Sequence, residues 1–206
     1  MRPEIFLRAA LRVALYCIFI ALLFLIPLAD AYRGSLFNEW SFVEIGQSLM
    51  LPIISGMLLY SALRIKALQA SALLLLAFTF SSLIRENDHL FDAVHKHLWP
   101  VLVALVIVPA LYLTWRRRVL FFTEMETYTQ STSFGLLIGS ILTTYVYSRL
   151  YGMGGFWRLS LQENYVRTIK NMSEECVELL GYGLMFLAVV EFLRLARQTA
   201  APSTRQ

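Results

Sequence analysis

The densest group of side chains that could carry chemistry lies between residues 85 and 97, where the sequence reads Arg-Glu-Asn-Asp-His-Leu-Phe-Asp-Ala-Val-His-Lys-His. If the preceding apolar helix continues to about Val94, carboxylates and imidazoles recur there at three- and four-residue spacing and share one helix face. Carboxylate and imidazole groups are the usual protein ligands of zinc, iron and manganese. The candidate metal ligands are Asp88, His89, Asp92 and His95.

The same segment also has a purely structural interpretation. Opposite charges at three- and four-residue spacing stabilise a helix end in water, and Arg85 with Asp88 and Asp92 with Lys96 have this spacing. Neither interpretation identifies a cofactor, and zinc is the example that carboxylate and histidine ligands suggest. The metal site and the solvated helix end are both open on the sequence alone.

Two further acids fall inside other apolar stretches. Glu44 begins one of them, and Pro52 removes the backbone donor for the Ser48 carbonyl, which leaves a free acceptor about one turn from Glu44. Glu178 lies inside the last apolar stretch. Ionisable groups within a membrane span are costly unless they face a cavity or a partner, so each of these acids is a functional-site hypothesis.

We therefore predict that acids from three helices converge on one site for a cation or a basic ligand, with one basic residue placed to neutralise them. The predicted members are Glu44, Asp92, Glu178 and Arg85. Arg149 is predicted to reach toward lipid phosphate instead. Glu174 and Glu175 are predicted to be shallow and hydrated.

The composition places these side chains in a membrane protein. Of the 206 residues, 58% are hydrophobic and 16% are charged, whereas soluble domains carry about 25% charged residues. A bilayer core about 30 Å thick needs roughly 20 apolar residues per helix. The predicted fold is therefore all-α, a polytopic bundle of about six transmembrane helices, with residues 1–198 as one domain and 199–206 as a short polar cytoplasmic tail. The six apolar stretches are 11–29, 42–63, 66–84, 98–115, 131–150 and 174–193.

Basic residues set the predicted orientation. Short cytoplasmic loops retain Lys and Arg, and threading the six stretches with both termini inside leaves eleven of the eighteen basic residues on the cytoplasmic side. Ten of the fourteen acids and all three histidines then fall on the outer side. We therefore predict a multi-pass protein of a bacterial inner membrane. The excess of positive charge reports topology rather than nucleic-acid binding, so the lipid bilayer is the expected partner.

Motifs of common enzymes are absent from the sequence. The chain has no GxGxxG, no P-loop, no HExxH and no GxSxG. Cys17 and Cys176 are predicted to lie at different depths, too far apart for a disulfide. No known family is indicated by these residues.

Two patterns predict how helices pack. Gly135-x-x-x-Gly139 predicts a close helix contact, either within the chain or in a homodimer, and we favour the internal contact. Apolar residues at every fourth position over 157–169 predict a helix that lies along the outer membrane surface, and a short re-entrant or packed connector is the alternative.

The sequence supports three classes of function. The leading one is an integral inner-membrane protein whose outer-face Asp, Glu and His cluster binds a cation or basic ligand, in transport, sensing or assembly. The second is a metal-dependent membrane hydrolase acting at the outer leaflet, where zinc would activate a bound water. The third is a structural subunit of a larger membrane complex, with a homo-oligomer or another membrane protein as partner. Whether the chain is an enzyme is open on the sequence alone.

Overall fold

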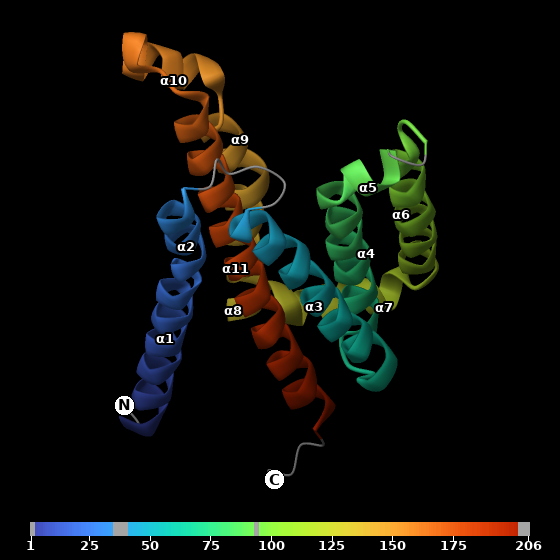
Figure 1. Cartoon of the computed structure of the whole chain (residues 1–206). Helices are drawn as coiled ribbons and strands as arrows, with labels where there is room; N and C mark the ends of the chain where they lie inside the picture. Colours follow the sequence, from blue (N-terminus) through green and yellow to red (C-terminus); the bar gives the residue numbers. More distant parts are fainter. Residues whose placement is uncertain (1–2, 35–40, 93–94, 202–206) are drawn as a thin grey trace. The chain divides into compact units, whose positions relative to one another are not determined.

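The computed structural model describes residues 3–34, 41–92 and 95–201, without the side chain of Asp92 (Figure 1). All regular elements among these residues are helical, which confirms the predicted all-α class. Element η1 is a π-helix and η2 a 3₁₀ turn. In chain order the elements are α1 (Pro3–Leu23), α2 (Leu25–Arg33), α3 (Phe42–Arg64), α4 (Gln69–Glu86), α5 (Asp88–Asp92), α6 (Leu98–Arg116), α7 (Arg118–Thr129), α8 (Thr132–Ile141), η1 (Leu142–Tyr147), α9 (Ser148–Tyr151), α10 (Gly154–Leu161), η2 (Gln162–Asn164) and α11 (Arg167–Ala200).

Within the described part of the chain, four helical segments are long and apolar enough to cross a membrane, namely α1 with α2, then α3, α6 and α11. These helices indicate a membrane protein. The third predicted span corresponds to α4, which ends in Arg85 and Glu86, and the fifth to the run from α8 to α9, which η1 interrupts. Both are helical, but neither is among the four, so the count of six spans stays a prediction.

The last helix is longer than the apolar pattern predicts. Helix α11 has 34 residues, whereas the predicted span is 174–193. At about 1.5 Å per residue it is roughly 50 Å long, which exceeds the hydrocarbon core of about 30 Å. The tail predicted from residue 199 is still helical as far as Ala200. A bilayer therefore cannot cover the whole helix, and its ends must extend into the head groups or water.

The helix predicted along 157–169 is not continuous. Helix α10 ends at Leu161, Gln162 has φ 48° and ψ −118°, and the chain is extended at Tyr165 before α11 begins. The indole N–H of Trp157 donates a hydrogen bond to the carbonyl of Tyr151 at 2.6 Å. This bond fixes α10 to the end of α9. The non-helical backbone at Gln162 ends the row of apolar residues that was predicted to share one helix face.

The chain divides into two compact units. The first comprises residues 1–46 and 140–183, and the second comprises residues 47–139 and 184–206. Helices α3, α8 and α11 contribute residues to both units. In the second unit α4 and α6 lie side by side, with α5 between their ends (Figure 1).

In the first unit, a buried carboxylate fixes the beginning of α3. The side chain of Asp30 in α2 accepts hydrogen bonds from the backbone N–H groups of Phe42 and Val43, at 3.0 and 2.9 Å, and Asp30 is 0% exposed. The Ser41 hydroxyl accepts the N–H of Glu44 at 3.2 Å. The first N–H groups of a helix have no partner within the helix and carry a partial positive charge, so a carboxylate is well placed there. This arrangement connects α2 to α3.

In the second unit, Glu124 of α7 does the same for α4. Its carboxylate accepts the backbone N–H groups of Ala70 and Ser71, at 3.1 and 2.7 Å, and the Ser71 hydroxyl at 2.8 Å. Tyr128, one turn further along α7, packs edge-on against Phe134 and Phe192. Burial raises the pKa of the Tyr128 hydroxyl to about 12, so it stays protonated. Polar and aromatic contacts together dock α7 on its unit.

Close helix packing occurs at glycines other than those predicted. A Cβ added at Gly181 would lie 1.9 Å from Thr144 Oγ1, and the Ser140 hydroxyl donates to the Gly181 carbonyl at 2.8 Å. By contrast, apart from the adjoining residues and the backbone of the same helix, no heavy atom of the described residues lies within 4 Å of a Cβ added at Gly135 or Gly139. The internal contact predicted at Gly135-x-x-x-Gly139 is therefore wrong, because Ser140 and Thr144 lie on the face that meets α11.

Replacing Glu124 by Gln should destabilise the protein by about 2–4 kcal/mol. The amide keeps the shape of the side chain, but it turns an NH₂ group toward one of the donors and removes the charge that strengthens the remaining bonds. Thermal unfolding in detergent measures the loss. The matched control is Glu126→Gln, an exposed acid on the same helix. Equal melting temperatures for the two variants would contradict a capping role for Glu124.

Candidate functional site

The helix that was predicted to carry the candidate metal ligands is interrupted. Helix α4 ends at Glu86, and Asn87 leaves the helical region with φ −107° and ψ 27°. Both the backbone N–H of Asn87 and its side-chain amide donate to the carbonyl of Leu83. Continuation of the third helix to about Val94 is therefore wrong. The short helix α5 begins at Asp88, and its side chains do not continue the helical faces of α4.

The candidate metal ligands are not gathered in the described part of the chain. Asp88 is half-buried, whereas His89 and His95 are exposed, and the side chain of Asp92 lies outside the described residues. The ring of His95 lies 2.8 Å from the carbonyl of Lys96. Within the described ranges, His, Cys, Asp and Glu form no group of three or more that could hold a metal. The zinc site and the hydrolase that depends on it stay predictions, and metal analysis of the purified protein tests them.

Two other members of the predicted acid cluster have defined surroundings. Arg85 forms an ion pair with its neighbour Glu86. Glu44 is half-buried in the first turn of α3, where Ser41-x-x-Glu44 has the pattern of a capping box. Because the side chain of Asp92 is not described, convergence of Glu44, Asp92 and Glu178 on one site stays a prediction.

Glu178 has a partner that the sequence analysis did not assign to it. Its carboxylate forms an ion pair with Arg149 of α9, with 2.7 Å between Oε1 and Nη2. The hydroxyl of Ser148 lies 3.3 Å from the same carboxylate oxygen. The side chain of Glu178 is 4% exposed, whereas that of Arg149 is 46% exposed. A nearly buried acid is thus neutralised by a base that still reaches the surface.

The prediction that Arg149 points to lipid phosphate is wrong, and η1 explains why. A π-helix closes its hydrogen bonds one residue later than an α-helix. Residues after η1 are therefore displaced by about one residue, or roughly 100° around the helix axis. On an ideal α-helix Arg149 would lie nearly opposite the face that carries Gly135 and Gly139, and it would point to lipid. In the structure it faces the acids of α11.

Glu174 belongs to the same network. The other guanidinium nitrogen of Arg149, Nη1, lies 2.9 Å from Glu174 Oε1, and Lys170 pairs with the second oxygen of that carboxylate. A Cβ added at Gly152 would lie 2.5 Å from the Glu174 carboxyl, so only glycine leaves room for it. The prediction that Glu174 is simply hydrated is wrong, since its side chain is 12% exposed and ion-paired.

The network is formally neutral, with two carboxylates, one guanidinium and one ammonium. Its acids lie one helical turn apart on α11, and a single guanidinium bridges them. Two carboxylates in this arrangement form a receptor for a planar cation, because each presents an oxygen to one N–H edge of the guanidinium. We refer to Arg149, Lys170, Glu174 and Glu178 as the α9–α11 ion network.

A sequence signal for this network existed. Consecutive helices usually pack against each other, and in the six-stretch threading the fifth and sixth spans form a hairpin whose outer ends carry Arg149 and Glu178. Opposite charges at matching depth on neighbouring spans predict a pair. The pair was not predicted, because a continuous α-helix would direct Arg149 away from Glu178.

Comparison of the chain with protein-family descriptions, with curated proteins and with solved structures finds no match.

Replacing Glu178 by Gln should lower the thermal stability of the protein. The variant removes the buried charge that pairs with Arg149, and we expect a loss of about 1–3 kcal/mol, between the values for exposed and for fully buried ion pairs. Glu163→Gln, at an exposed acid of the same unit, is the control and should unfold like the wild type. Unchanged stability of Glu178→Gln would mean that the pair contributes nothing to the folded state.

Proposed function

We propose that this chain is a multi-pass membrane protein that binds a cation or a basic ligand through the paired carboxylates of Glu174 and Glu178. The observation that carries the proposal is the single guanidinium of Arg149 bound by both acids, at 2.9 and 2.7 Å. An arrangement that fits one guanidinium also fits another, so the ligand class is a guanidinium or primary ammonium compound.

Binding would proceed by exchange of the internal cation for the external one. The carboxylates are fixed, because Glu178 is buried and Glu174 is confined by Gly152 and Lys170. Arg149 is half-exposed, so it can turn outward to water or to lipid phosphate. The incoming positive charge takes the place of the departing one, and the network stays neutral. Exchange therefore avoids the cost of an unpaired buried carboxylate.

Transport, sensing and assembly differ in what the released Arg149 does. The predicted inner halves of the spans contain few acids, which disfavours a continuous path for ions across the membrane. Sensing or assembly requires only that ligand binding changes the position of Arg149. We therefore favour these two roles over conduction.

The proposal includes six spans with both termini in the cytoplasm of a bacterial cell, which places the ion network at the outer side of the inner membrane. The distribution of Lys and Arg supports this topology. Reporter fusions after Arg118 and after Gln198 should be cytoplasmic, and fusions near His97 and Met153 should be external. An external C-terminus would contradict the six-span topology.

Assembly into a larger membrane complex is a second candidate function. In the most apolar part of α1 with α2, and likewise of α6, only 6% of the residues are buried within the chain. Lipid satisfies such surfaces as well as protein does, so exposure alone does not identify a partner. Chemical crosslinking of the chain in native membranes, followed by mass measurement, separates a lipid-exposed monomer from a complex subunit.

Removing the internal cation should create a site for an external one. In Arg149→Ala the carboxylates of Glu174 and Glu178 lose the bridging guanidinium, so the variant should be less stable than the wild type and should recover stability in millimolar guanidinium or agmatine. Urea, a neutral molecule of similar shape, is the ligand control, and Arg149→Ala with Glu178→Gln is the protein control. The wild type should bind agmatine more weakly than Arg149→Ala, because its own arginine competes. Absence of agmatine binding by both proteins would overturn the proposed function.

A further inference from the structure

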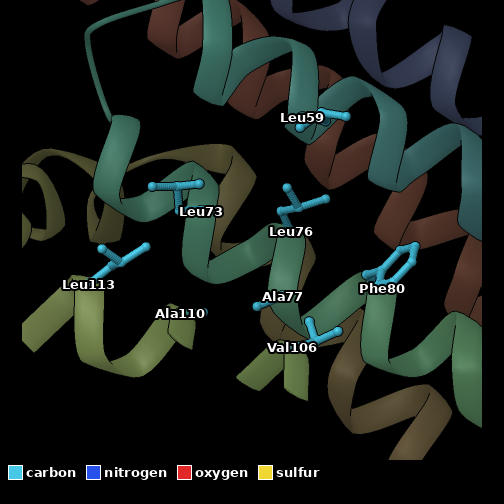
Figure 2. A pocket seen from close by; sticks show the side chains of 8 residues that line it. All are labelled: Leu59, Leu73, Leu76, Ala77, Phe80, Val106, Ala110 and Leu113. Carbon is cyan, nitrogen blue, oxygen red and sulfur yellow. The ribbon is translucent and has the colours of Figure 1, made fainter. Parts of the chain in front are cut away.

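The second unit contains an apolar groove between α3, α4 and α6, with a volume of about 330 Å³ (Figure 2). All eight lining side chains are Leu, Ala, Phe or Val. Helix α4 contributes a row that includes Leu73 and Ala77, and α6 contributes a row that includes Ala110 and Leu113. The two alanines leave room between the rows. An apolar groove of this kind along a membrane helix fits a hydrocarbon chain.

One end of the groove lies beside a cationic cluster. Leu113 is one turn before Arg117 on the chain, and Leu73 is one turn after Gln69. Arg117 Nη1 donates a hydrogen bond to Gln69 Oε1 at 3.3 Å. The rows from α4 and α6 therefore end at the contact between Arg117 and Gln69. This contact lies one helical turn beyond the apolar lining.

The neighbouring arginines are held by aromatic rings that are typical of the membrane interface. The guanidinium of Arg116 lies 5.9 Å from the ring centre of Tyr112, and that of Arg118 lies 5.6 Å from the ring of Trp115. Exposed Trp and Tyr side chains favour the level of the lipid head groups. Residues 116–118 thus present three guanidinium groups at the depth where a phosphate would lie if the groove held its acyl chain.

We propose that this groove and arginine cluster form a binding site for an anionic phospholipid. One acyl chain lies between Ala77 and Ala110, and the phosphate lies against Arg117. The charge of the cluster selects an anionic lipid over a zwitterionic one, because arginine binds phosphate oxygens with paired N–H donors. On the proposed topology the cluster faces the cytoplasmic leaflet, where anionic lipids attract basic residues near the membrane. The site shares no residue with the α9–α11 ion network.

The proposal is tested by native mass spectrometry of the full chain in detergent, with palmitoyl-oleoyl phosphatidylglycerol as probe and the matching phosphatidylcholine for comparison. The wild type should retain phosphatidylglycerol and lose phosphatidylcholine. Ala110→Phe fills the groove and should weaken phosphatidylglycerol binding about tenfold, the effect of excluding roughly two methylene groups. Arg117→Gln should reduce the preference for phosphatidylglycerol about fivefold, as expected for one basic residue near a membrane surface.

Two matched variants control for general effects. Ala104→Phe makes the same change on an exposed position of α6, and Arg64→Gln removes an exposed charge at the end of α3. Both should bind phosphatidylglycerol like the wild type. Equal retention of the two lipids by the wild type, or wild-type binding by Ala110→Phe, would overturn the proposal. If Ala110→Phe does not fold, unchanged lipid preference in Arg117→Gln overturns it, and a loss of dimers instead of lipid in either variant would identify a second copy as the occupant.

Discussion

A carboxylate cannot be buried in apolar surroundings unless donors compensate its charge. Three of the buried acids among the described residues bind donors that come from other helical elements. Asp30 binds the first backbone N–H groups of α3, Glu124 binds those of α4, and Glu178 binds the guanidinium of Arg149. Each acid therefore constrains two elements at once. Such contacts define which faces of the connected helices meet.

The three acids differ in how easily their donors can leave. The backbone N–H groups are fixed in α3 and α4, so Asp30 and Glu124 lose them only when an acid side chain turns away or the two elements separate. The donor to Glu178 is a flexible side chain that is half-exposed. Of these three acids, Glu178 is the one whose partner is a side chain that can move away while the helices stay intact. This difference separates the two structural acids from the α9–α11 ion network and makes the network the candidate site.

The lengths of the apolar stretches predicted the helices well, because a bilayer of fixed thickness requires about 20 apolar residues per helix. The all-α class and the apolar character of α1, α3, α6 and α11 follow from composition alone. Glu178 was singled out correctly as an acid that needs a partner, since its position within a span made it costly. These predictions depend on average properties of many residues.

The predictions that failed depend on single residues that change the backbone. Asn87 ends α4 through its bonds to Leu83, and η1 rotates the residues that follow it, including Arg149. Neither effect alters hydrophobic periodicity, so a helical projection of the sequence continues the third helix past Arg85 and places Arg149 on the wrong face. The caps at Asp30 and Glu124 join residues 12 and more than 50 positions apart, beyond the reach of local patterns.

The most direct test of this account is a double-mutant cycle between Arg149 and Glu178. Unfolding free energies would be measured in detergent for the wild type, Arg149→Met, Glu178→Gln and the double variant. A direct ion pair predicts that the double variant is more stable than the sum of the two single losses implies, with a coupling of about 1–3 kcal/mol. A coupling of zero, with additive losses, would contradict the ion pair and with it the exchange mechanism at the α9–α11 ion network.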